Sequence, residues 1–235
     1  MAVELIPRAE ALGALPVLAH TVRGMQDAED PSRDYNRETW AGREAEGAAW
    51  FAARRDPPPE RVVEVPKHDG VMIFAAPSPD RDEALDELAA GLVRLMETQG
   101  DSTLTFLHTA RDRSWPSPRT TPAVLADAAA WFRAAGAGEE FDGALRTGAD
   151  GLRELLRALA WSVRMDMGYG DVFFAPDRSP WVGSLCQYAN LHLDVYGRGE
   201  AVRVASAASR AGLVAVEECG EREEGGAIPF RELRV

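Results

Sequence analysis

The sequence predicts an α+β fold: a mixed or antiparallel central sheet of about five to six strands packed against helices, with an N-terminal helical arm. Three observations predict it. The chain has 235 residues, 46% of them hydrophobic and 27% charged, which suffices for one substantial core. Strand-like and helix-like stretches are mixed, without the strict alternation of a parallel α/β sheet. No fixed period is present, so a repeat architecture is excluded.

Residues 1–59 are expected to form the N-terminal helical arm and a proline-rich spacer. The apolar stretch 11–19 is interrupted by a proline and preceded by acidic residues, so it is typical of a helix docked on the body and not of a secretory signal. A further helix is expected over 36–55, although its apolar stripe is thin. Its large aromatics are Trp40, Trp50 and Phe51. The three prolines at 57–59 favour an extended spacer.

A single α+β core domain is expected over 60–218. It begins with strands at 61–66 and 70–76, which we interpret as a hairpin because Asp69-Gly70 is a common two-residue turn. The remaining elements follow from helical and alternating apolar periodicity. They are helices at 78–100, 121–136, 152–163 and 200–211, strands at 103–109, 172–175, 184–196 and 213–217, and a charged C-terminal tail at 219–235.

The stretch 184–196 carries the first site hypothesis, because one long strand here would place several polar side chains on a single face. On an unbroken strand, Cys186 and His192 lie roughly 20 Å apart, too far for a thiol–imidazole pair. His192 and Asp194 lie only about 7 Å apart, so the carboxylate can orient the imidazole. These two are the catalytic candidates, and the competing interpretation is that they are polar side chains on the solvent-facing side of the strand. No metal site is expected, since no paired motif supplies further ligands.

A second site hypothesis rests on three strand ends that run into loops of similar composition, which we call the Asp-Arg loops, at 77–81, 111–116 and 176–181. If the strands are parallel neighbours, these loops meet at one end of the sheet, the usual place for a ligand crevice. Arginines there would hold an anionic ligand while tryptophans stack on it. The competing interpretation is that these are ordinary turn residues and that each tryptophan covers the core. The candidate ligand-binding residues are Arg81, Arg113, Trp115, Arg178 and Trp181.

The amino-acid composition excludes several classes of function. The 38 acidic and 26 basic residues give a formal charge of −12, so non-specific nucleic-acid binding is not expected. No apolar run is long enough for a membrane helix, and two cysteines make neither a disulfide framework nor a zinc motif. Lys67 is the only lysine amid abundant arginine and alanine, which is typical of a GC-rich bacterial genome. We expect a cytoplasmic protein without a cofactor.

The first functional hypothesis is a bacterial cytosolic protein that binds a protein partner without catalysis, as adaptors, chaperone-like modules and immunity proteins do. An acidic surface favours a basic partner. The alternative is a small-molecule enzyme or ligand-binding protein that recognises an anionic ligand through the Asp-Arg loops. No nucleotide loop, Ser-His-Asp order or paired-carboxylate motif decides between them, so whether the chain is an enzyme stays open.

Overall fold

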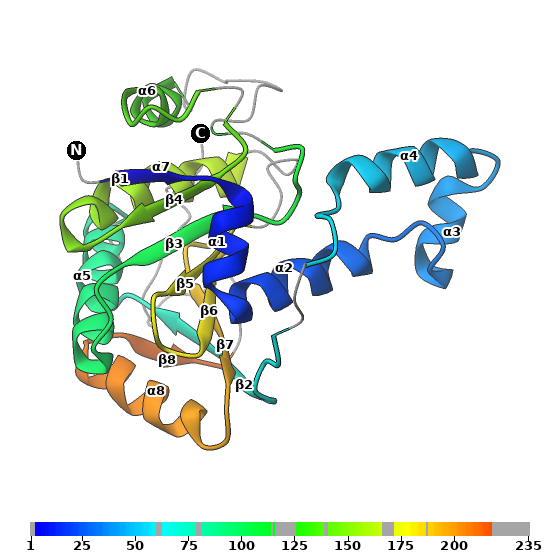
Figure 1. The fold of residues 1–235 in the computed structure, drawn as a ribbon. Helices are drawn as coiled ribbons and strands as arrows, with labels where there is room; N and C mark the ends of the chain where they lie inside the picture. Colours follow the sequence, from blue (N-terminus) through cyan, green and yellow to red (C-terminus); the bar gives the residue numbers. More distant parts are fainter. Residues whose placement is uncertain are drawn as a thin grey trace.

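The computed structural model has one open sheet with helices against both faces (Figure 1). It describes residues 3–59, 63–78, 81–113, 115, 126–138, 141–165, 172–186 and 188–217, without the side chains of Tyr35, Arg81, Trp161, Arg164 and Met165. The strand order within these residues is β1-β4-β3-β5-β6-β7-β2-β8. The strands are β1 (Val3–Ile6), β2 (His68–Ala75), β3 (Leu104–His108), β4 (Ala144–Thr147), β5 (Val172–Pro176), β6 (Trp181–Leu185), β7 (Leu191–Tyr196) and β8 (Val214–Val216).

Every pairing in this sheet is antiparallel, which confirms the α+β class. The expected count of five to six strands is wrong, because the described residues form eight. The helices are α1 (Arg8–Ala14), α2 (Pro16–Ala28), α3 (Asp34–Trp40), α4 (Glu44–Arg54), α5 (Arg81–Gln99), α6 (Ala126–Ala134), α7 (Ala149–Met165) and α8 (Glu200–Arg210). Among the described residues, every helix is too short or too polar to cross a lipid bilayer.

The larger core lies between one face of the sheet and helices α5 to α8. Alternate strand residues point into it, as the period of two requires. Phe106 of β3 and Phe174 of β5 stack there with ring centroids 4.8 Å apart, and Leu193 of β7 is fully buried in the same cluster. At the end of α5, Gly100 adopts φ +80°, a left-handed conformation that glycine tolerates and that ends the helix where the sequence predicts.

A second core covers the opposite face of the sheet and is built by the N-terminal residues. Leu12 of α1 and Leu18 of α2 are buried against Leu107 and Phe173 of the sheet. The segment 11–19 therefore docks on the body as predicted. The N-terminal region, expected to be a helical arm, also contains a strand, since β1 pairs antiparallel with β4 and forms one edge of the sheet.

Helices α3 and α4 extend away from the rest of the molecule and together form what we call the α3–α4 arm (Asp34–Arg54; Figure 1). The sequence predicts one helix over 36–55. The structure has two, because Gly42 adopts φ +76° and reverses the chain between them.

The expected hairpin about Asp69-Gly70 is also wrong. Both residues lie inside β2, which pairs with β7 and β8, and the described residues 63–67 form no strand. The Asp69 carboxylate instead accepts a hydrogen bond from the backbone N–H of Ala201, at 2.9 Å, in the first turn of α8. A short acidic side chain serves a helix N-terminus as well as it serves a turn.

The long strand predicted over 184–196 is two strands, β6 and β7, joined by a hairpin. Leu185 pairs with Leu191, and the turn is closed by a hydrogen bond from Cys186 N to Asn190 O at 3.1 Å. Ala189 lies in the left-handed region at φ 54°. The turn contains no glycine and no Asn-Gly pair, the usual signals of a hairpin, and the alternation of apolar residues continues through it. The sequence therefore predicts one strand where there are two.

Candidate functional site

The parallel arrangement that would bring the three Asp-Arg loops together is absent. Strands β3 and β5 pair antiparallel, with Leu104 opposite Pro176 and His108 opposite Val172. The loop that follows β3 and the loop that follows β5 therefore lie at opposite ends of the sheet. Arg113 and Arg178 cannot share one crevice in this topology.

Each tryptophan of these loops is a core residue. Trp115 is fully buried, and its Nε1 donates a hydrogen bond to Gly143 O at 2.9 Å. The centroid of its ring lies 4.1 Å from that of His108. Trp181 is also fully buried and donates to Gln99 Oε1 at 2.7 Å. A ring enclosed in this way has no free face on which a ligand can stack.

The three arginines differ in their surroundings. Arg113 is buried, whereas the Arg178 side chain is 73% exposed and lies 3.6 Å from the Asp177 carboxylate. The side chain of Arg81 lies outside the described residues, although its backbone begins α5. No common anion site follows from these positions.

The second candidate pair, His192 and Asp194, lies on the face of β7 predicted from alternation, together with Tyr196. The imidazole that Asp194 holds is that of His68 in β2, with 3.1 Å between Nε2 and Oδ1. Cys186 and His192 do not lie on one unbroken strand, as the sequence predicts, because the chain reverses between them and Ser184 lies opposite His192.

Three of the four histidines gather around the Asp194–Tyr196 end of β7. The rings of His68 and His20 meet the Tyr196 ring edge-on, at 5.3 and 5.9 Å between centroids. The Tyr196 hydroxyl lies 3.0 Å from Thr21 Oγ1. No three His, Cys, Asp or Glu side chains among the described residues are placed to hold a metal ion. The cluster joins α2, β2 and β7 by polar contacts.

Sequence reasoning missed His20 and His68, since neither belongs to a motif. Their approach to Tyr196 depends on the register in which His68 of β2 stands opposite Tyr196 of β7, and on the docking of α2 over this face. A sequence signal for β2–β7 pairing would have been needed to find them.

Electrostatics at this cluster disfavour a charged His192. Burial lowers the pKa of His192 below its ordinary value of 6.5, and the Asp194 carboxylate opposes that shift. Burial raises the pKa of Tyr196, and the hydrogen bond with Thr21 opposes it. At neutral pH the His192 imidazole and the Tyr196 phenol, which share one face of β7, are therefore both uncharged.

The stability of the protein is expected to fall between about pH 7 and about pH 5, because the unfolded chain takes up a proton at residue 192 before the folded chain does. Replacing His192→Gln is expected to reduce this slope, by at most about 1.4 kcal/mol for each pH unit. Urea unfolding at both pH values measures the difference. Ser184→Ala, at the opposed position in β6, is the control. An unchanged slope in His192→Gln would contradict the assignment.

A different surface remains on the α3–α4 arm. The rings of Trp40 and Trp50 lie 5.4 Å apart between centroids, and neither ring belongs to either core cluster. Trp40 packs so closely on Gly47 that a Cβ at position 47 would lie 2.8 Å from its ring. Phe51 is only partly buried as well. The large aromatic side chains of the arm therefore pack outside both core clusters.

The arm is attached to the body by buried charges. Arg54, at the end of α4, is buried between the carboxylates of Glu29 and Asp112, at 3.2 Å from each, and its guanidinium lies over the Trp50 ring at 4.6 Å. A second buried group, Arg8 with Asp56, lies just beyond the end of α4. Because these contacts are directional, they hold the arm at a defined angle.

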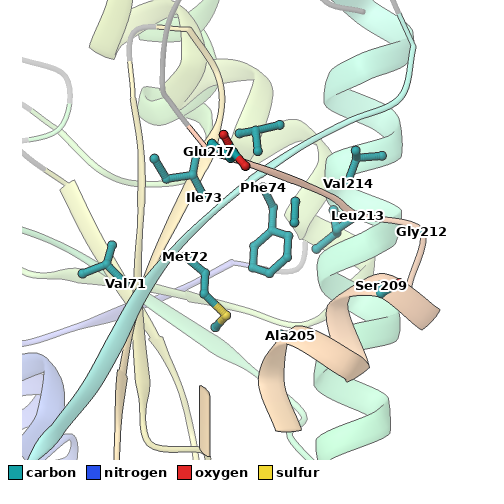
Figure 2. Close-up of a pocket in the computed structure, with 12 residues that line it drawn as sticks. Val71, Met72, Ile73, Phe74, Ala205, Ser209, Gly212, Leu213, Val214 and Glu217 are labelled. Atoms are coloured by element: carbon teal, nitrogen blue, oxygen red, sulfur yellow. The ribbon is translucent and has the colours of Figure 1, made fainter. Parts of the chain in front are cut away.

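A groove of ≈ 900 Å³ lies on the other side of the molecule, between β2, β8 and α8 (Figure 2). Its lining is mostly apolar, and two valines at its surface are exposed, Val71 by 58% and Val214 by 41%. Ser209 and Glu217 are the polar side chains of the lining. A small-molecule site usually has several convergent polar groups, so this groove suits a peptide segment better.

We compared the chain with protein families, curated proteins and solved structures to find a relative of known function. No protein-family model, no curated protein and no solved structure matches the chain.

Proposed function

We propose that this protein is a non-catalytic binding module and that its α3–α4 arm contacts a basic protein partner. The observation that carries the proposal is the arm itself: two helices extend from the body with Trp40 and Trp50 outside both cores. Tryptophan and arginine are the residues that most often dominate the energy of protein interfaces. Buried attachment through Arg54 supports the same function, since a preorganised element loses less entropy on binding.

The outward surface of α4 suits close contact with another protein. Alanines at positions spaced by three and four residues are all exposed, so this helix face is smooth and apolar without a partner in the described part of the chain. These residues are Ala45, Ala48, Ala49, Ala52 and Ala53.

Charge favours a basic partner. The exposed charged side chains of the α3–α4 arm are four acids and two bases, because Arg54 is buried. They are Asp34, Glu38, Glu44 and Glu46, against Arg37 and Arg43. The whole chain carries −12, so its net charge attracts a basic partner at long range.

Ala49→Arg tests the arm, with Val202→Arg as the matched control. Both positions are exposed on helices, the second 75% exposed on α8, and arginine is a good helix former, so both variants should fold. With each protein immobilised in an extract of the source cells, we expect one stoichiometric companion. That companion, once purified, should bind Ala49→Arg about tenfold more weakly than it binds wild type and Val202→Arg.

Two results would contradict the proposal. Equal affinity of the companion for all three proteins would place the contact elsewhere. A concentration-dependent dimer in sedimentation, lost in Ala49→Arg and kept in Val202→Arg, would show that the arm joins two copies of this chain. Weaker binding at higher salt is expected if charge steers the encounter.

A further inference from the structure

Three aromatic rings of the α3–α4 arm each lie beneath an arginine that follows the ring by three or four residues. A cation within about 6 Å of a ring centroid is attracted to the face of the ring. The pairs are Arg43 with Trp40, Arg54 with Trp50 and Arg55 with Phe51, at 5.2, 4.6 and 5.5 Å from the guanidinium carbon to the ring centroid. The arm therefore presents its aromatic rings to guanidinium groups of its own chain.

The three pairs differ in how firmly the arginine is held. The Arg54 side chain is 7% exposed and is held by two carboxylates. Arg55 forms an ion pair with Asp27 at 2.7 Å. The Arg43 side chain is 54% exposed, and its ion pair with Glu46 spans 3.5 Å. Because exposed ion pairs contribute little to stability, Arg43 leaves its ring at the lowest cost of the three.

The ring beneath Arg43 is itself held in place by the arm. The centroid of the Trp50 ring lies 5.4 Å from that of Trp40. Gly47 is packed so closely on Trp40 that no side chain fits at position 47. A ring fixed in this way loses little conformational entropy when a ligand binds to it, so Trp40 is a preorganised platform for a cation.

Arg43 also marks the polar contacts that a guanidinium makes at this ring. Its Nη1 lies 3.5 Å from the Glu46 carboxylate, and its Nη2 donates a hydrogen bond to the carbonyl oxygen of Thr39 at 3.1 Å. A guanidinium has a flat face that stacks on aromatic rings and five N–H donors that bind carboxylate and carbonyl oxygens. The ring, the carboxylate and the carbonyl together match all of these features.

We propose that Trp40, Glu46 and the Thr39 carbonyl form a subsite for an arginine side chain of the basic partner, and that Arg43 occupies this subsite until the partner displaces it. This inference rests on the proposed function of the arm and names the side chain by which the partner is recognised. Arg43 competes as an intramolecular ligand, tethered three residues from the ring. The partner overcomes this competition because it also contacts the other exposed acids of the arm.

Arg43→Gln tests the exchange, with the peptide acetyl-Arg-Arg-Arg-amide as the probe. The substitution removes the competitor and leaves the ring and Glu46 in place. The matched control is Arg37→Gln, which removes another exposed arginine of the arm, also in an i,i+3 ion pair, and changes the net charge equally. In an NMR titration the probe is expected to bind Arg43→Gln about two- to fivefold more tightly than Arg37→Gln, the range of an exposed cation–π contact. Equal affinity for the two variants would overturn the proposal.

The double variant Trp40→Leu/Arg43→Gln separates the ring from the charge. Leucine keeps an apolar side chain at position 40 but has no aromatic face, so the gain in affinity should disappear. The aliphatic protons of the probe's arginines should shift upfield, through the ring current, with Arg43→Gln and not with the double variant. A gain that persists in the double variant would refute the subsite, because charge alone would then explain it.

The companion protein separates this inference from the proposed function. We expect the companion to bind Arg43→Gln more tightly than Arg37→Gln. If Ala49→Arg weakens its binding while these two variants bind it alike, the arm is the interface and the subsite is refuted. If the probe prefers Arg43→Gln while the companion binds Ala49→Arg as it binds wild type, the subsite is supported and the proposed function fails.

Discussion

The substitution Arg8→Ala is expected to lower the free energy of unfolding by about 3–5 kcal/mol, the usual cost of removing one partner of a buried ion pair. The guanidinium is 7% exposed and holds both Asp56 carboxylate oxygens at 2.7 Å. It also donates to the carbonyl oxygens of His108 and Thr109, at 2.8 and 2.9 Å. Alanine leaves a buried carboxylate and two carbonyls short of a donor. Urea or thermal unfolding measures the loss.

The control is Arg37→Ala, which removes an exposed ion pair with Asp34 whose side chains are 69% and 92% exposed. Such pairs contribute about 0–1 kcal/mol. The double variant Arg8→Met/Asp56→Leu should recover part of the loss, since the uncompensated charge disappears while Gln26 and two carbonyls still lose partners. A cost below about 1 kcal/mol for Arg8→Ala would show that water replaces the guanidinium.

Trp181→Ala is the second change with a large expected effect, again about 3–5 kcal/mol of unfolding free energy. The ring is fully buried, meets Phe174 edge-on at 6.2 Å between centroids, and its N–H binds Gln99 at the end of α5. Truncation leaves a cavity between β6 and α5. Chemical denaturation gives the loss, and Trp181→Phe should fall between wild type and alanine, because it fills most of the space but leaves Gln99 without its donor.

Trp50→Ala is the matched control for this prediction. Its ring is only partly buried and belongs to the arm, so its removal should cost clearly less than that of Trp181. The comparison also separates the two interpretations of the tryptophans. If Trp181 were held ready for a ligand, its loss would leave stability nearly unchanged and would remove a ligand response instead.

Much of the secondary structure could be predicted because it depends on local patterns. Leucines at helical spacing located α5 and α7, and alternation located β3 and assigned the buried and polar faces of β7. The aromatics of the arm were visible in the same way. Each of these patterns is complete within a few turns or a few residues of chain, so no distant segment is needed to interpret it.

The candidate site was harder to predict, because it depends on which strands become neighbours. Asp194 meets His68, 126 residues away, only because β7 pairs with β2. The antiparallel pairing of β3 with β5 separates Arg113 from Arg178, although their loops look alike in sequence. Neither pairing leaves a mark in the composition of the segments it joins.

The amino-acid sequence by itself determined the α+β class, the acidic charge and the extent of most helices, since helix period and net charge are local or additive properties. The tertiary structure alone decided that Val3–Ile6 would be an edge strand, that the chain would reverse at Ala189, and that β2 would lie between β7 and β8. The physical reason is that strand hydrogen bonds are made with another segment. Their partner is selected by how the whole chain buries its apolar faces, which no single stretch encodes.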